Sequence, residues 1–315
     1  MTNIYDLQLF AENTQVTTQS SLSDEMKVFY SDYLIDNATP KLVHDQFGQK
    51  HPIPKNGGKT IEFRKYSPLG KMLTPLTEGV TPDGQSLTVS TITATVAQYG
   101  GYITLSDVLL MTAIDNNMVQ ATKLLGNQAG ATLDTITREV LNGGTNVIYA
   151  GGAASREALS GVLTVEDIKK AVRALKNQNA DKIGDSFVAI IHPDVAYDLT
   201  NDPKWEAVKD YDPKDWYEGE IGRIHGVRFV ETTEAKIFDG AVYSTLILGD
   251  NAYGVTEIEG GGLEHIVKQL GSAGTADALN QRATVGWKAT KVAERLVEQF
   301  MVRIESKSTF EGEAN

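Results

Sequence analysis

The chain has 315 residues, a formal net charge of −12 and no cysteine. Its length allows about two domains of roughly 150 residues, and the missing cysteines exclude a disulfide framework, thiolate zinc sites and cysteine nucleophiles, as in a reducing cytosol. The acidic balance argues against tight nucleic-acid binding, because that affinity comes mostly from basic side chains, and the sequence holds no cluster of five or more of them.

Residues 1–57 predict an extended arm that carries one short helix. Residues 1–20 are polar, without a basic leader, and we expect them to be mobile unless a partner holds them. A helix then begins near Ser21 or Ser23, and prolines break the chain after it. The apolar face of this helix comprises Leu22, Met26, Phe29, Tyr33 and Leu34. It packs on its own subunit or on a neighbour; in the second case Phe29, Tyr33 and Leu34 are subunit contacts.

Residues 58–105 predict a long β-hairpin with an irregular apolar tip. Residues 59–66 alternate apolar and polar side chains, and residues 87–105 are rich in Thr, Val, Ile and Tyr, so both predict strands. The prolines and glycines of residues 67–86 exclude a helix or a long strand there. This tip also holds five apolar side chains: Leu69, Met72, Leu73, Leu76 and Val80. Because such a segment is uncommon inside a compact domain, we expect these five to contact a neighbouring subunit.

Residues 115–142 predict one long helix, because apolar residues recur there at helical spacing for seven turns. Asn117 can cap its start, and Gly143 and Gly144 follow its end. At about 1.5 Å per residue the helix is on the order of 40 Å long, which suits a scaffold for thinner parts. The apolar stripe comprises Met118, Ala121, Leu125, Ala129, Leu133, Ile136 and Val140.

Residues 160–275 predict a compact α/β domain. Thr164 and Asp167 form a helix start that resembles a capping box, and Pro193 opens a second helix. The expected strands are 187–191, 227–230, 243–248 and 263–270. Two further β runs, 283–292 and 299–305, end the chain. We expect both to pack beside the long helix and to close a domain that the α/β region interrupts.

No motif gives a positive sign of catalysis, of a metal site or of a cofactor site. Residues 58–60 resemble the end of a P-loop, but Ile53 stands where a glycine is needed and a strand follows. Residues 210–215 (DYDPKD) place Lys214 where a calcium loop needs an oxygen ligand, which favours a solvated acidic turn. The five histidines show no pair at metal-binding spacing, and His192 is better explained as a helix cap than as a catalytic group. We also find no run that approaches the ~20 apolar residues of a membrane span and expect a soluble protein.

Five stretches are distinctive in combination: IPKNGGKTIEFRKYSPL, LTEGVTPDG, QYGGYITLSDVL, ATVGWKAT and MVRIE. Together they resemble the major capsid proteins of tailed bacteriophages, specifically the N4-like branch, over about residues 25–305. The resemblance implies the α+β Hong-Kong-type shell fold. Its expected parts are an N-terminal arm (1–57), an extended hairpin loop (58–105), a peripheral domain with a spine helix (106–159 and 276–315) and an inserted axial domain (160–275).

The resemblance also implies a structural, non-enzymatic protein that self-assembles into the icosahedral shell around a double-stranded DNA genome. Its implied partners are further copies of itself as pentamers and hexamers, a separate scaffolding protein and a portal, with decoration proteins left open. DNA is enclosed without sequence-specific binding, no membrane is involved, and assembly takes place in the cytoplasm of a bacterial host. Two alternatives stay open: a bacterial nanocompartment shell that encloses enzyme cargo, and an α/β metal-dependent hydrolase that uses His192 and the carboxylates of residues 210–215.

Overall fold

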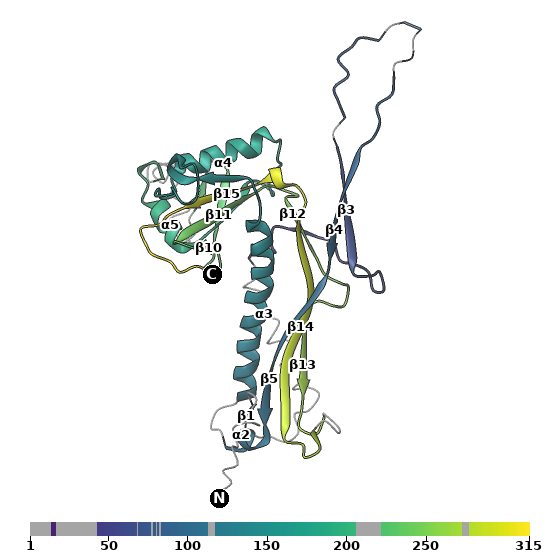
Figure 1. The fold of residues 1–315 in the computed structure, drawn as a ribbon, viewed down its shortest axis with the longest axis vertical. Helices are drawn as coiled ribbons and strands as arrows, with labels where there is room; N and C mark the ends of the chain where they lie inside the picture. Colours follow the sequence, from purple (N-terminus) through teal and green to yellow (C-terminus); the bar gives the residue numbers. More distant parts are fainter. Residues whose placement is uncertain are drawn as a thin grey trace, which may run out of the picture.

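The computed structural model describes residues 14–16, 43–67, 69–76, 78–79, 81, 83–112, 117–205, 222–272 and 277–315. These form a six-stranded sheet beside a long helix, a seven-stranded sheet with two helices, and a two-stranded hairpin. In Figure 1 the hairpin points away from the other two parts, and the long helix runs along the six-stranded sheet up to the seven-stranded one.

The long helix is α3 (Asn117–Asn142), which confirms the helix predicted for residues 115–142. Its apolar stripe packs against β5 (Ala97–Ser106) and β14 (Arg282–Arg295), which pair antiparallel over ten residues. Each large side chain buried here contributes roughly 1.5–3 kcal/mol by transfer from water. The buried side chains of this core include Leu105, Met118, Leu125, Ala129, Leu133, Val285 and Trp287. The other strands of the sheet are β1 (Thr14–Val16), β2 (Gln49–Lys50), β12 (Tyr253–Thr256) and β13 (Glu264–Lys268), and α2 (Asp107–Thr112) follows β5.

Glycines on β5 and β14 make room for the aromatic side chains opposite them. Gly101 pairs with Trp287, and Tyr102 pairs with Gly286. A Cβ on Gly101 would lie 2.6 Å from the Gln128 side-chain oxygen of α3, which accepts a hydrogen bond from Trp287 Nε1 (3.1 Å). Gly101 therefore lets helix and sheet approach closely, whereas Gly286 makes room for Tyr102 on the neighbouring strand.

The seven-stranded sheet has the order β6 (Val147–Tyr149), β15 (Met301–Ser306), β11 (Val242–Leu248), β7 (Phe187–Ile191), β9 (Val227–Glu231) and β8 (Arg223–Ile224), with β10 (Ile237–Phe238) on β11. The helices α4 (Val165–Asn177) and α5 (Pro193–Thr200) bury their apolar faces in the core of this unit. Thr164 caps α4 by accepting from the Asp167 amide, as its sequence predicts, and Pro193 stands in the first turn of α5.

Two strands are placed differently from our expectation. The strand expected over 263–270 in the α/β domain is β13, which pairs with β14 in the six-stranded sheet. Of the two β runs expected beside the long helix, only β14 lies there; β15 lies between β6 and β11 in the other sheet, with all six residues buried. Its charged residues are compatible with burial because Arg156 donates two hydrogen bonds to Glu305 (2.6 and 2.7 Å), which Arg303 also contacts (2.9 Å). The short helical turn Glu298–Phe300 precedes it.

The hairpin consists of β3 (Thr60–Tyr66) and β4 (Val89–Thr95), paired in register from Thr60 with Thr95 to Tyr66 with Val89. The β run expected over 87–105 is thus two strands, because the chain leaves the hairpin at Val96 and continues as β5 in the six-stranded sheet. The hairpin is therefore a direct extension of a strand of the helix-backed sheet.

Neighbouring leucines on α3 test the packing of this core. Leu125 is buried, whereas Leu124 is exposed. We expect Leu125→Ala to lower the free energy of unfolding of the free subunit by about 2–5 kcal/mol, because it removes buried atoms and leaves a cavity. The matched Leu124→Ala change should stay within about 0.5 kcal/mol. Urea unfolding of both variants measures this, and equal losses would show that α3 does not pack on β5 and β14 through this face.

Candidate assembly surface

The base of the hairpin is held firmly to the rest of the subunit. Ile61 and Phe63 of β3 are half-buried, and the Phe63 ring lies so close to Gly254 of β12 that a Cβ there would be 3.2 Å from it. The His51 ring meets Phe63 edge-on at 5.7 Å, and the Val96 amide donates to the Lys59 carbonyl (2.8 Å). The root therefore fixes the direction in which the hairpin leaves the body.

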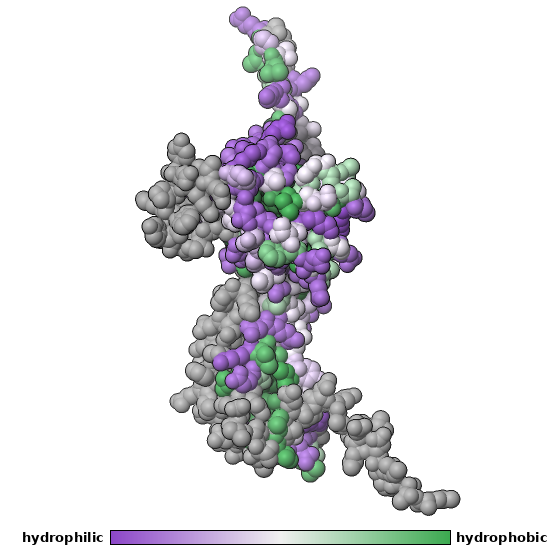
Figure 2. All heavy atoms as spheres, turned by 90° about the vertical axis from the view of Figure 1, so that its left-hand side faces the viewer, coloured by the Kyte–Doolittle hydropathy of each residue, from purple (hydrophilic) through white to green (hydrophobic). Residues whose placement is uncertain are grey.

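The tip, in contrast, exposes the apolar side chains that the sequence analysis assigned to a neighbour. Leu69, Met72, Leu73 and Leu76 are 59, 64, 83 and 76% exposed. Gln85 links the two limbs by donating to the Gly70 carbonyl (2.9 Å). Figure 2 shows apolar side chains near this end of the molecule. Val80 lies outside the described residues, as do Phe29, Tyr33 and Leu34 of the expected arm helix.

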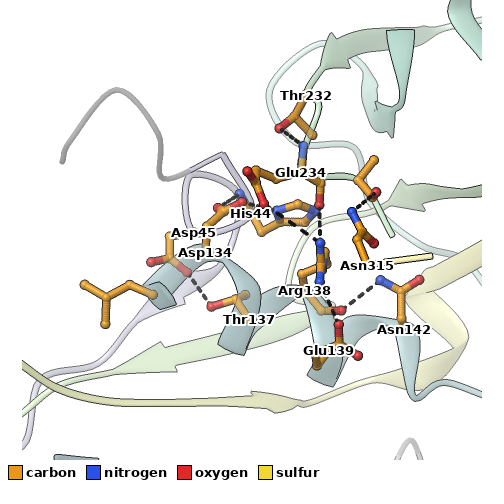
Figure 3. A network of polar contacts seen from close by, with 12 residues as sticks. His44, Asp45, Asp134, Thr137, Arg138, Glu139, Asn142, Thr232, Glu234 and Asn315 are labelled. Carbon is orange, nitrogen blue, oxygen red and sulfur yellow. Dashed lines mark hydrogen bonds and ion pairs between the residues drawn. The ribbon is translucent and has the colours of Figure 1, made fainter. Parts of the chain in front are cut away.

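The segment that leads to the hairpin is fastened to α3 by buried polar groups (Figure 3). The His44 amide donates to Asp134 Oδ1 (2.8 Å), and His44 Nδ1 lies 2.7 Å from Asp134 Oδ2, with both side chains fully buried. The neighbouring Asp45 accepts a hydrogen bond from the Thr137 hydroxyl (2.5 Å) and forms an ion pair with Lys291 of β14. One short segment is therefore bonded to both the helix and the sheet beneath it.

Burial changes the acid–base behaviour of the groups around this anchor. Desolvation lowers the pKa of Lys291, although Asp45 opposes the shift, and Lys291 Nζ also donates to the Leu133 carbonyl (2.8 Å). Desolvation raises the pKa of Tyr253, whose hydroxyl donates to the His44 carbonyl. Removing a partner here would leave a polar group unpaired in the interior, which makes these contacts costly to break.

A second polar cluster joins the end of α3 to the seven-stranded sheet unit (Figure 3). Arg138 donates to the Glu234 carbonyl (2.9 Å) and to Glu139 (3.0 Å). Asn142 accepts from the Ser244 hydroxyl (2.5 Å) and, through its carbonyl, from Arg303. The helix is therefore bonded at one end to the strands of the neighbouring unit, which sets the position of that unit relative to the hairpin.

The structure also shows the surroundings of residues with potential for chemistry. His192 Nδ1 accepts from the Asp194 amide (3.2 Å), so this side chain caps α5, as preferred from the sequence. Residues 58–60 lead into β3, so no helix follows them. Residues 210–215 lie outside the described residues. Among the residues that are described, no group of three or more His, Cys, Asp or Glu side chains could hold a metal ion.

Sequence reasoning did not find the anchor at His44. Asp134 and Arg138 are one helical turn apart beside the apolar stripe. Two opposite charges next to a buried face were the one sequence signal that pointed to buried polar partners there. Its partners come from residues about 90 positions away along the chain, which no local pattern specifies. No described helix is long and apolar enough to cross a membrane.

The anchor generates a prediction. Asp134→Ala should lower the free energy of unfolding by at least about 2 kcal/mol, because it leaves two buried nitrogen groups of His44 without their partner. Exposed Asp239 provides the control, and Asp239→Ala should cost less than about 0.5 kcal/mol. Limited proteolysis should also cut residues 43–57 sooner in the Asp134 variant. Unchanged stability and unchanged cleavage would contradict the assigned role of this anchor.

Comparisons with known proteins agree with this arrangement. A capsid of cyanophage P-SCSP1u is similar in structure at 14% sequence identity with a TM-score of 0.66, covering 85% of this chain and 89% of that one. The capsid of cyanophage Pam1 is similar at 14% identity with a TM-score of 0.65, and that of Ralstonia phage GP4 at 13% identity with a TM-score of 0.65. Each of these matches covers 99% of this chain and 100% of the other. A search of curated protein sequences gave no match.

At these identities the similarity of structures establishes the mixed α/β shell fold. The family model described as phage capsid protein matches residues 89–297, well over half of the chain, from the hairpin's second strand to the end of β14. The chain therefore belongs to the phage capsid protein family, and it is a major capsid protein that forms the icosahedral shell of a bacteriophage virion.

Proposed function

We propose that the β3–β4 hairpin is an intersubunit arm whose tip packs on a neighbouring copy, so that copies assemble as pentamers and hexamers into the shell. The observation that carries this proposal is the exposure of four large apolar side chains at the end of a ladder whose root is fixed. An exposed apolar cluster of this kind marks an interaction site on a folded protein. The hairpin brings this cluster out from the subunit core without enlarging that core (Figure 1).

The energetics of repetition support the arm. Each tip side chain buried on a neighbour contributes roughly 1.5–3 kcal/mol by transfer. A shell repeats a head-to-tail contact at every position, and such a contact needs two different patches on each copy. The tip is one such patch, because it lies far from the apolar cores of its own subunit and is exposed in the free chain.

The remaining assignments follow the family resemblance. We infer membership of the N4-like branch, with the arm at 1–57 and the hairpin loop at 58–105. The peripheral domain is centred on 106–159 and 276–315 and the axial domain on 160–275, and the two exchange strands, since β12 and β13 lie in the six-stranded sheet and β6 and β15 in the seven-stranded one. The arm helix with Phe29, Tyr33 and Leu34 would add further contacts. The protein would act without catalysis, together with a separate scaffolding protein and a portal, and assemble in the bacterial cytoplasm. The alternatives of a nanocompartment shell and a hydrolase are not favoured, because the matching family is that of phage capsids and His192 is a helix cap.

The hairpin proposal is tested by making its tip polar. Leu73→Asp/Leu76→Asp should abolish shell formation, because each carboxylate buried on the neighbour would lack a partner. The same change should shift the thermal midpoint of the free subunit by no more than a few degrees, because exposed loop substitutions usually cost under about 0.5 kcal/mol each. The measurements are sedimentation of the assembly mixture and a melting curve of the subunit.

A control variant separates apolar contact from charge. Thr74→Asp/Ser86→Asp adds the same charge to the same exposed tip without removing an apolar group, and it should assemble better than the leucine variant. Normal particles from the leucine variant, or a large loss of subunit stability, would show that the tip is not an intersubunit contact.

The acidic balance generates a prediction about DNA. Because the net charge is −12, the free subunit should bind duplex DNA more weakly than micromolar near physiological salt and without sequence preference. Fluorescence anisotropy with a labelled duplex checks this. Micromolar or tighter binding with a steep dependence on salt would show that the protein condenses DNA on its surface and does not simply enclose it.

A further inference from the structure

A basic groove of about 320 Å³ lies along one face of α4. It is lined by Lys169, Val172, Arg173, Lys176, Asn177 and His225. The three cationic residues follow the spacing i, i+4 and i+7 and so lie on one face of the helix. His225 comes from the tight turn between β8 and β9, where it has a positive φ of 51°. Two elements distant in sequence thus bring basic groups to one exposed groove.

Carboxylates of the described residues do not neutralise this groove. In the part of the chain that the structure describes, no ion pair involves Lys169, Arg173 or Lys176. Glu166, on the same helix, lies 3.5 Å from Lys204 instead. The pKa of His225 is lowered, first by burial and then by the charges of Lys169 and Lys176, each of which exceeds the opposing effect of Glu166. A protein with a net charge of −12 therefore keeps a concentrated positive site on one unit.

We propose that this groove binds the acidic segment 206–221 of a second copy of the chain. That segment contains six acidic and two basic residues, a net charge of −4. It leaves the described structure after Trp205 and re-enters it at Gly222, three residues before His225. The described residues at both ends of this segment thus belong to the unit that carries the groove, and the segment and the groove have opposite charge. The inference rests on the proposed function, since it assumes that copies meet in repeated head-to-tail contacts.

Two physical arguments favour a second copy as the occupant. A head-to-tail contact requires two different and complementary patches on every copy, and a basic groove with an acidic segment meets that requirement. Nucleic acid is the other polyanion to consider, but the −12 charge of the subunit repels it and the groove offers only a few phosphate contacts. The groove therefore sets which neighbours associate and in which orientation.

Reciprocal charge reversal in the full-length chain tests the proposal. The groove variant is Lys169→Glu/Arg173→Glu/Lys176→Glu, and the segment variant is Asp210→Lys/Asp212→Lys/Asp215→Lys. Each alone should fail to sediment as assemblies, although the two change the net charge by equal and opposite amounts. A mixture of the two should regain sedimenting assemblies, because each groove then meets a segment of opposite charge on the other variant. A tagged segment variant should also retain the untagged groove variant on beads, but not another copy of itself.

Other outcomes overturn the proposal. Normal assembly of the groove variant would show that the groove is not an interface. Recovery in a single chain that carries all six changes, without recovery in the mixture, would show that the segment occupies its own groove. Submicromolar duplex binding by the wild type that the groove variant loses would assign the groove to nucleic acid.

Because the changed groove residues are exposed, the melting curve of the groove variant should stay within a few degrees of that of the wild type. If the leucine tip variant fails to assemble while the groove variant assembles, only this inference is wrong.

Discussion

The packing of α3 on β5 and β14 is the contact on which the rest of the subunit depends. One face of the helix covers the sheet, and its polar residues near the C-terminal end bind both the segment before the hairpin and the seven-stranded unit. The helix therefore joins the six-stranded sheet, the segment before the hairpin and the seven-stranded unit. Because the hydrogen bonds of these polar residues are buried, they favour one arrangement of the three parts over others that apolar contact alone would allow.

The subunit separates the interactions that stabilise it from those available to neighbours. The clusters beside α3 and within the seven-stranded unit are closed and buried. The tip leucines and the basic face of α4 are exposed and contribute little to the single chain. One is apolar and the other charged. In the proposed assembly, apolar burial would provide affinity, whereas charge complementarity would select the partner and its orientation.

The shape of the hairpin follows from a division within one continuous β segment. Residues 89–95 pair only with β3, whereas residues 97–106 pair with β14 and lie beside α3. The first part is exposed except near its root, where Ile92 is half-buried and Ala94 is buried, and the second part is half-buried over much of its length. Since a two-stranded ladder is marginally stable alone, its fixed root at Phe63 and Gly254 is what gives the arm a defined direction.

The sequence by itself determined the features that arise from local patterns. The seven-turn stripe specified α3, the capping residues specified the starts of α4 and α5, and the prolines and glycines of the tip ruled out regular structure there. Only the tertiary structure decided which sheet each strand joins. A strand buried on both faces has the same sequence pattern in either sheet, so the sequence predicts β15 beside α3, whereas its pairing with β6 and β11 places it in the seven-stranded sheet. The same reason applies to His44 with Asp134 and to the groove between α4 and His225: their members are distant in sequence, and only the packing of whole elements brings them together.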